Sequence, residues 1–598
     1  MATKSRSNEG CWTCRLRRKK CDELRPLCGV CAALEIDCLY SDDKPEWMDG
    51  GEKQKERAHR LKEIVKRRAG RRRERRSGYA QDLESDVEGL EVSQVEESDS
   101  SVAGMTPTSS GSSAGTVPAS FRQATGAGPD ESPFFRDEER ELHLIGLYLD
   151  YVFPFLFPFY RPGLLDAGRG WLLVVLTRNK ALMHASLSLA SYFFSVALNH
   201  TSDGAHDTCK AHNFDELQRQ QDLALKELQR EMQDLVIRGV KGCLVEGNRV
   251  MASIMQLLTY EVAIGNTGNW LMHLDAAAEL FRELMTHHAR TDVGAPCFTM
   301  VLAQLGPFTD TRGYHPWNSD QASLRFFTAY LLFVDVLAST GLEQPPRLQQ
   351  RHRHLLGEPD EEVKKARPGA GDGPHINMHE FLGIQNWVVV AIGEISALDT
   401  WKKEQKRAGS LSMTQLVARA TVIERPLRGR ISTLDMSADN GPCPPVINDP
   451  IDPLVEYSHQ AGLLSSPMLK SAGAVSYVWA QAALTYLSVV VSGWQPASTE
   501  VRESVSLTLA MLKALPTASC LRTLIWPFTV TGCLAAPEQE QAFRDLVAAL
   551  GPLQVFGTIK EGLAIMEHVW AHRADVERCE HWDLAACFRC LGHTALLI

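Results

Sequence analysis

The sequence predicts a small, cysteine-rich, metal-stabilised head joined by a disordered linker to a large all-helical body. Three observations predict this architecture. Six of the 15 cysteines lie between Cys11 and Cys38, positive charge is concentrated in the first 76 residues, and apolar residues after about position 133 recur at helical spacing. A chain of 598 residues is also too long for a single hydrophobic core, so two or more domains are expected.

Charge is distributed unevenly along the chain. Residues 1–76 contain 22 Lys and Arg against 13 Asp and Glu, so the net charge of −10 divides into +9 for this segment and −19 for the rest. Hydrophobic residues at 44% and charged residues at 23% are ordinary for folded proteins and exclude wholesale disorder. A basic head on an acidic body indicates that the head meets a polyanion.

The six clustered cysteines form an internal repeat, C-x2-C-x6-C, which occurs twice with an offset of 17 residues. They are Cys11, Cys14, Cys21, Cys28, Cys31 and Cys38. Each C-x2-C pair has the spacing of a structural zinc site. One tetrahedral zinc would leave two thiols over, and residues 1–58 contain no histidine that could complete two separate sites. Six thiolates therefore satisfy two zinc ions only if two cysteines bridge both metals.

The symmetry of the repeat assigns the bridging role to the first cysteine of each copy, Cys11 and Cys28. One zinc then takes Cys11, Cys14, Cys21 and Cys28, and the other takes Cys11, Cys28, Cys31 and Cys38. A segment this short needs such a staple in order to fold. The alternatives are disulfides or unrelated buried thiols. Two identical spacings, in a chain whose N-terminus has no apolar leader and is expected in a reducing compartment, argue against both.

The two copies of the repeat differ in charge. Cys14 is followed by five cations in six residues, Arg15, Arg17, Arg18, Lys19 and Lys20, whereas the six residues after Cys31 contain none. This segregation assigns the first copy to nucleic acid. Its short helix could enter a major groove, where an arginine or lysine can bond to guanine, while the remaining cations would meet phosphates.

The stretch Gly10–Glu23, GCWTCRLRRKKCDE, resembles the fungal-type Zn2Cys6 binuclear zinc cluster of transcription factors, and Pro26 matches the proline usual between the two halves. The resemblance implies the same two-zinc arrangement. It also implies that Arg17 and Arg18 read CGG-type triplets in double-stranded DNA and that Arg15, Lys19 and Lys20 contact the DNA backbone.

Two further stretches carry weaker resemblances. Residues 44–51 are similar to a flank of regulators likened to those of acriflavine sensitivity. Residues 269–277 are similar to a second type of fungal-specific regulatory domain, which implies that the helical body is a regulatory domain. The predicted domains are thus a Zn2Cys6 DNA-binding domain at 1–45, a basic tail at 46–80, a linker at 81–132 and a helical regulatory domain at 133–598.

The tail and the linker are assigned by composition. Residues 62–76 hold nine Lys and Arg, which favours a nuclear localisation signal or an extra DNA contact over a solvated helix. Residues 81–132 are first acidic and then rich in Ser, Gly, Thr and Pro, which predicts a disordered linker rather than an activation segment. A coiled coil after the cluster is not indicated, because Leu61, Ile64 and Val65 make barely one turn of seam. Homodimerisation is therefore left open.

The body is read from its periodicity. Leu271, Leu274, Ala278, Phe281 and Leu284 follow a helical pattern, with Asn269 as the expected N-cap, and Ala480 to Val491 form a second helical run. Proline- and glycine-rich breaks predict loops at 343–375 and 439–453. The apolar stretches 181–198 and 475–491 are short for membrane spans and are interpreted as core helices, so no membrane partner is expected.

These observations predict a nuclear, sequence-specific regulator of RNA polymerase II transcription that binds DNA through the head and the transcription machinery or co-regulators through the body. The common catalytic motifs are missing, so no enzyme activity is expected. Cys579, His581, Cys587, Cys590 and His593 look like core residues rather than a second metal site. Two alternatives stay open, a zinc-dependent protein-interaction module and an enzyme in the body that the zinc head targets.

Overall fold

The computed structural model describes the head and most of the body. The described residues are 10–62, except 18, 22, 24–27, 33–35, 37, 42, 43, 46, 52 and 60, and then 137–162, 168–198, 207–266, 268–289, 297–307, 317–357, 376–434, 472–515 and 517–598. They belong to two compact units, one within residues 1–125 and the other within 126–598.

Every regular element in these residues is a helix, which confirms the predicted combination of a small cluster domain and a large all-helical body. The predicted linker at 81–132, most of the basic tail and the loop at 439–453 lie outside the described residues. The four domain boundaries stay predictions.

The head contains three short helical segments. These are α1 (Trp12–Leu16), α2 (Gly29–Ala32) and a helical segment at 53–59 that continues at 61–62. α1 and α2 each begin directly after the first cysteine of one copy of the repeat, and the two helices contact each other.

The first half of the body runs from residue 137 to residue 342. Its elements are α4 (Asp137–Leu147), the π-helical η1 (Tyr148–Val152), α5 (Phe153–Leu156), α6 (Gly170–Arg178), α7 (Lys180–Leu198), α8 (Asp207–Arg238), η3 (Val240–Gly242), α9 (Leu244–Ala263), α10 (Trp270–His288), α11 (Phe298–Gln304) and α12 (Ser319–Leu342).

The second half follows from residue 349. Its elements are α13 (Gln349–Leu356), α15 (Met378–Leu382), α16 (Asn386–Arg407), α17 (Met413–Thr433), α20 (Ala472–Ser492), α21 (Thr499–Lys513), η4 (Ala518–Leu524), α22 (Ile525–Cys533), η5 (Pro537–Gln539), α23 (Glu540–Ala548), η6 (Gly551–Val555), α24 (Ile559–Ala571), α25 (Arg573–Arg578) and α26 (Leu584–Arg589).

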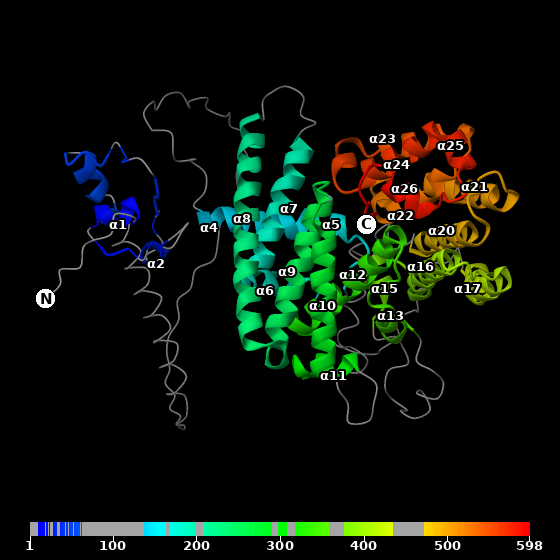
Figure 1. Ribbon diagram of the computed structural model, residues 1–598, viewed down its shortest axis with the longest axis horizontal. Helices are drawn as coiled ribbons and strands as arrows, with labels where there is room; N and C mark the ends of the chain where they lie inside the picture. Colours follow the sequence, from blue (N-terminus) through cyan, green and yellow to red (C-terminus); the bar gives the residue numbers. More distant parts are fainter. Residues whose placement is uncertain are drawn as a thin grey trace, which may run out of the picture. The chain divides into compact units, whose positions relative to one another are not determined.

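Long helices pack side by side in the first half of the body. α8 packs on α7, α7 on α9, and α9 on α10, and Figure 1 shows these four helices nearly aligned. α9 is buried along almost its whole length, and so is α12, which crosses from this group to the second half through contacts with α9, α6 and α16. These two helices therefore form the centre of the hydrophobic core.

α12 begins at a well-formed N-cap. The Asn318 side chain accepts from the backbone N–H of Gln321 at 2.9 Å, and the Gln321 side chain accepts from the Asn318 N–H at 3.1 Å. This reciprocal pair satisfies N–H groups that a helix start would otherwise leave without partners. The helix ends at Glu343, which has a left-handed φ of 55°.

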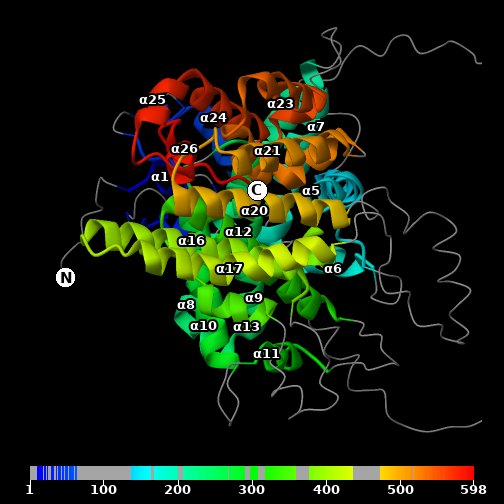
Figure 2. The same cartoon turned by 90° about the vertical axis from the view of Figure 1, so that its right-hand side faces the viewer.

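The second half of the body packs around α20. Figure 2 shows α17 and α20 lying side by side, and α20 also contacts α16, α21 and α22. α22 in turn packs on α24. The C-terminal helices thus form a layer on one side of α20, and α17 lies on the other side (Figure 2). Trp479 of α20 and Trp526 of α22 stack with ring planes 2° apart and join the two layers.

Two described helices are long and apolar enough to span a membrane, namely residues 319–342 and 473–492. In their most apolar stretches, 94% and 78% of the residues are buried inside the protein, which is typical of core helices. The sequence indicated the second of these helices as a possible span. It also indicated 181–198 and did not indicate 319–342, the α12 helix, whose apolar residues are interrupted by polar side chains.

Helical periodicity predicted the buried faces well. Leu274, Ala278, Phe281 and Leu284 are all buried in α10, whereas Leu271 is exposed at the start of the helix. The prediction of the N-cap was half right. α10 does begin directly after Asn269, but this side chain makes no capping hydrogen bond and instead opposes the rise that burial causes in the pKa of Glu261.

The predicted loop at 343–375 contains a helix, α13 (Gln349–Leu356). Its buried residues, His352, Leu355 and Leu356, have helical spacing that the neighbouring prolines obscured. The chain enters α13 over the fully buried Asp335, whose carboxylate accepts hydrogen bonds from the backbone N–H groups of Arg347 and Leu348 at 2.9 Å each. Residues 358–375 lie outside the described residues.

Candidate metal centre and nucleic-acid interface

The two halves of the cysteine repeat have the same backbone hydrogen bonds. The N–H of Cys14 donates to the sulfur of Cys11 at 3.3 Å, and the N–H of Cys31 donates to the sulfur of Cys28 at 3.4 Å. The first cysteine of each copy therefore acts as an acceptor at the start of a short helix. The repeat in the sequence is thus a repeat in the structure.

The six sulfur atoms gather into two overlapping groups of four. One group is Cys11, Cys14, Cys21 and Cys28, and the other is Cys11, Cys28, Cys31 and Cys38; within each, the sulfurs lie within 4.8 Å of one another. Cys11 and Cys28 belong to both groups. The sulfurs of these two residues lie 3.8 Å apart.

These separations fit zinc. With Zn–S bonds of about 2.3 Å, the sulfurs of a tetrahedral site lie roughly 3.8 Å apart. Within the first group, Cys14 lies 3.6 Å from Cys28, and within the second, Cys11 lies 3.7 Å from Cys31. The sulfurs of Cys14 and Cys31 are also 3.8 Å apart although they belong to different groups, so single distances do not identify the bridging pair.

Three of the cluster thiols, Cys11, Cys14 and Cys31, need a cation in order to become thiolates at neutral pH. Burial raises the pKa of the Cys11 and Cys31 thiols and raises the pKa of Cys14 to about 11. Burial acts on Cys28 in the same direction, but the Cys31 N–H and neighbouring thiols hydrogen-bond to its sulfur and lower its pKa to about 6. Metal binding must therefore displace protons, as expected for a zinc–thiolate site.

The third cysteine of each copy lies at the rim of the cluster and is half-buried. The Cys21 sulfur is 3.5 Å from the Tyr40 hydroxyl, and the Cys38 sulfur accepts from the Cys28 N–H at 3.3 Å. A side chain at Gly10 would place its Cβ 2.9 Å from the Cβ of Cys21, so only glycine fits there. Gly10 and Tyr40 support the site, and the cysteine spacing gave no signal for either.

The cations of the first copy are presented in different ways. Lys19 and Lys20 are exposed, and the guanidinium of Arg15 lies over the ring of Trp12 at 4.5 Å from its centroid. Arg17 is half-buried, and its Nη1 atom is buried without a hydrogen-bond partner among the described residues. Arg18 lies outside the described residues.

α1 is held in place by the segment that follows Cys38, residues 39–41, hereafter the strap. The Trp12 backbone N–H donates to the Leu39 carbonyl at 2.8 Å, and the indole N–H of Trp12 donates to the Ser41 carbonyl at 2.9 Å. The Leu39 N–H returns a hydrogen bond to the Thr13 hydroxyl at 3.3 Å. These bonds fix the orientation of α1, which carries Arg15 and leads directly into Arg17.

The helical segment after the cluster also belongs to the head. Leu61 packs against the sulfur cluster, and the guanidinium of Arg57 lies 4.6 Å from the ring centroid of Trp47. Leu61 therefore faces the cluster instead of contributing to a dimer seam. Ile64 and Val65, the other residues of that weak seam, lie outside the described residues.

The C-terminal cysteines and histidines do not form a metal site, and among them only Cys587 is buried in the core of the body. Cys587 is buried and accepts from the Trp582 indole N–H at 3.2 Å, whereas Cys579 is exposed. His593 pairs with Glu561 at 2.6 Å, and His581 contacts Lys406. Among the described residues, only the two groups in the head bring metal ligands together.

Family models match both parts of the chain. The fungal Zn(2)-Cys(6) binuclear cluster domain matches residues 9–47, and the fungal specific transcription factor domain matches residues 143–598. The chain belongs to the fungal zinc-cluster transcription factors. The cluster of cysteines is thus a zinc site, and the chain is a DNA-binding transcription regulator rather than an enzyme.

Curated relatives in the zinc-cluster family align along most of the chain. The chain is 35% identical to the transcription factor dibT of Pestalotiopsis microspora, over 98% of this chain and 99% of that one. It is 25% identical to the pestheic acid cluster transcriptional regulator 3 of Pestalotiopsis fici, over 96% of each. It is 29% identical to a trichothecene biosynthesis transcription regulator of Trichoderma arundinaceum, over 70% of this chain and 87% of that one. No solved structure matches.

Proposed function

We propose that this zinc-cluster protein binds two zinc ions with Cys11 and Cys28 as the bridging ligands. The observation that carries this proposal is that the two groups of four sulfurs share these two residues. Each of these two sulfurs also accepts one backbone N–H at the start of a short helix, so the two copies of the repeat present their first cysteine in the same way. Zinc supplies the stability that the small head lacks and takes no part in base recognition.

We further propose that the head reads CGG-type triplets in the major groove through Arg17 and Arg18, while Arg15, Lys19 and Lys20 contact the DNA backbone. The hydrogen bonds that join Trp12 and Thr13 to the strap at residues 39–41 support this assignment, because they fix α1, which carries Arg15 and leads directly into Arg17. The buried, unpartnered Nη1 atom of Arg17 is a donor that would gain a hydrogen bond if the side chain turned to a guanine.

The body is the regulatory part in this proposal. It acts in the nucleus on RNA polymerase II transcription by contacting co-regulators or the transcription machinery. The names of two relatives refer to a pestheic acid cluster and to trichothecene biosynthesis. We infer that the genes controlled by this chain likewise encode a biosynthetic pathway.

Selection of bound sequences from random duplex DNA by the full-length, zinc-loaded chain tests the proposal. Enrichment of CGG triplets is expected, and the number and spacing of triplets reports whether a monomer or a dimer binds. Absence of any enriched sequence, with two zinc ions per chain verified, would contradict sequence-specific reading and favour a zinc-dependent protein-interaction module.

Two variants separate base reading from backbone contact. Arg17→Ala should cost about 1–3 kcal/mol of discrimination at one base pair, because a bidentate contact to guanine is lost. Lys19→Ala should weaken binding to all sequences alike and reduce the salt dependence by about one counterion. Full discrimination by Arg17→Ala with unchanged zinc content would remove Arg17 from the set of base-reading residues.

A further inference from the structure

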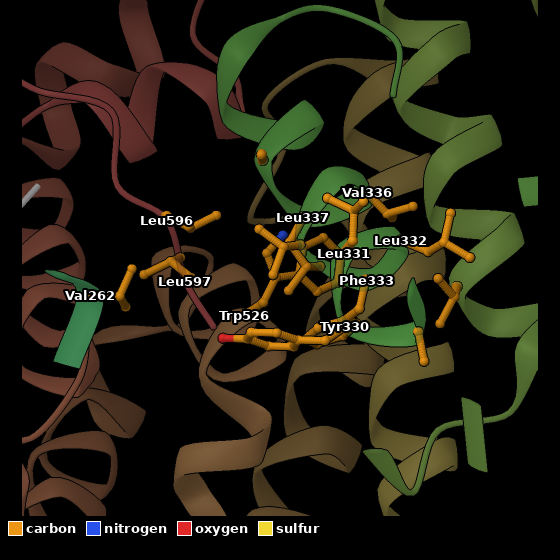
Figure 3. Packing of buried hydrophobic residues seen from close by; sticks show 14 of the residues in the cluster. Val262, Tyr330, Leu331, Leu332, Phe333, Val336, Leu337, Trp526, Leu596 and Leu597 are labelled. Carbon is orange, nitrogen blue, oxygen red and sulfur yellow. The ribbon is translucent and has the colours of Figure 1, made fainter. Parts of the chain in front are cut away.

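A cavity lies inside the body where α5, α9, α12, α15, α20 and η4 meet. About 670 Å³ of atom-free space lies within its outline, a volume that includes open solvent at its mouth. Most of its wall is apolar, with aromatic rings from Phe157, Phe381 and Trp479. Figure 3 shows the Tyr330 hydroxyl pointing from α12 toward the side of the core where Val262 lies.

Close packing beside the cavity keeps its wall from collapsing. Gly383 has a left-handed φ of 71°, and a Cβ there would lie 2.5 Å from the ring of Phe159, which lines the cavity. Elsewhere in the wall, the Trp479 indole N–H donates to the Thr523 carbonyl at 3.2 Å. These parts of the wall are therefore held by close packing and by a hydrogen bond, as expected for a preformed cavity.

Arg522 brings a positive charge into this apolar wall. Its Nε donates to the Phe155 carbonyl at 3.3 Å, and its Nη2 donates to the Leu156 carbonyl. No carboxylate pairs with Arg522 among the described residues, although its guanidinium also lies 5.1 Å from the ring centroid of Phe155. The side chain is half-buried, and burial lowers the pKa of Arg522 to about 10. A cation set against an apolar wall is stabilised when an anion pairs with it.

Tyr330 adds a polar atom to the same cavity. Its hydroxyl lies 3.2 Å from the Thr259 hydroxyl, which donates its own proton to the Met255 carbonyl at 2.8 Å. The Thr259 hydroxyl is the donor to Tyr330, so its proton is shared between the Met255 carbonyl and the Tyr330 oxygen, and the Tyr330 hydroxyl keeps its own proton to donate. The cavity thus offers one cation and one hydroxyl on an otherwise apolar surface.

We propose that this cavity binds an apolar small molecule that carries a carboxylate, with the carboxylate paired to Arg522 and the apolar part against Phe157, Phe381 and Trp479. An aliphatic and an aromatic acid share this chemistry. The site lies in the body and goes beyond the proposed function, because it does not depend on DNA recognition by the head.

The test measures binding of three probes to the full-length zinc-loaded chain by calorimetry and by tryptophan fluorescence. Decanoate and 2-naphthoate represent the aliphatic and aromatic acids, and decan-1-ol is the uncharged counterpart of decanoate. At least one acid should bind about 10- to 100-fold more tightly than the alcohol, because a hydrogen bond to a charged group is lost with the carboxylate. The stronger of the two acids identifies the class of ligand.

Arg522→Gln should abolish the preference for the acid over the alcohol, whereas Arg578→Gln, which changes an exposed arginine on α25, should keep it. Val262→Phe fills the cavity without changing its charge and should remove binding of all three probes. Because Arg522 also binds the last two carbonyls of α5, Val262→Phe serves as the decisive variant if Arg522→Gln does not fold.

Three outcomes would overturn the proposal. The first is equal affinity of the wild-type chain for acid and alcohol. The second is a folded wild-type chain that binds neither acid. The third is unchanged acid binding by Val262→Phe. DNA selection by the same preparation is scored separately, so a failure here leaves the assignment of the head unaffected.

Discussion

The head and the body are stabilised in different ways. The buried core of the head consists of four cysteines and Ile36, with Val30, Tyr40 and Leu61 packed around them. The body has a continuous core of aliphatic and aromatic side chains that extends from α4 to the C-terminal residues. The head therefore depends on a metal for its fold, whereas the body depends on apolar burial. The comparison implies that the two parts should fail under different conditions.

Zinc removal should give the largest difference in stability between the head and the body. A chelator should unfold the head and abolish DNA binding, since few apolar contacts remain to hold it, while the helices of the body persist. Binding assays, circular dichroism and hydrogen exchange by peptide would show this. Restored binding after zinc is returned is the control, and loss of protection in α9 and α12 would refute the separation.

Single cysteine variants should sharpen the comparison within the head. Cys28→Ser removes a ligand from both metals and should leave the head without zinc, whereas Cys38→Ser should lose one ion first. Cys243→Ser changes a buried cysteine of the body and should keep two ions per chain. Zinc analysis decides the matter, and equal zinc content of Cys28→Ser and Cys38→Ser would contradict the bridging scheme.

A glycine in the core of the body should affect the body alone. A Cβ at Gly532 would lie 1.8 Å from the Met566 sulfur, so Gly532→Ala should destabilise the body by about 1–3 kcal/mol through overpacking. Gly429 is exposed in α17 with open space around it, and Gly429→Ala should stabilise by about 0.5–1 kcal/mol. Urea unfolding measures both. Reduced zinc content of Gly532→Ala would show that the two parts are not independent.

A smaller effect is expected from acid. Burial alone would raise the pKa of Glu343, but hydrogen bonds from Arg589 and Lys403 outweigh it and lower the pKa to about 2. This stabilisation is present above the ordinary pKa of 4.5 and is lost as the pH falls from about 4.5 toward 2. Glu343→Gln should remove about 1 kcal/mol of this pH dependence, because solvent screens part of it. If Glu343→Gln unfolded in acid with the same profile as the wild-type chain, Glu343 would not contribute to this pH dependence.

The sequence predicted the metal centre better than its surroundings. Spacing alone determines which sulfurs can converge, so both groups of four cysteines followed from the repeat. The contacts of Leu61 and Tyr40 with the cluster depend on how later segments fold back, and no local pattern reports this. Asn269 illustrates the same limit, because a nearby buried carboxylate, Glu261, takes the side chain that would otherwise cap α10.

In the body, periodicity revealed helices and buried faces but not the cavity. Helical spacing identifies residues that face inward and does not say which inward faces fail to fill the space between them. Arg522 lies in a 3-10 helical segment whose sequence has no regular apolar pattern. The carbonyls that it contacts lie more than 360 residues earlier in the chain. Only the assembled fold brings these groups together.

The all-sulfur core of the head has a consequence for how the chain can evolve. In the body, a changed side chain can be accommodated by many neighbours, and substitutions can accumulate in small steps. In the head, no neighbour can replace a lost sulfur, so each cysteine is retained or the domain is lost. Substitutions should therefore accumulate faster in the body than at the cysteines of the head. The differences from a relative that is 35% identical should spare the six cysteines.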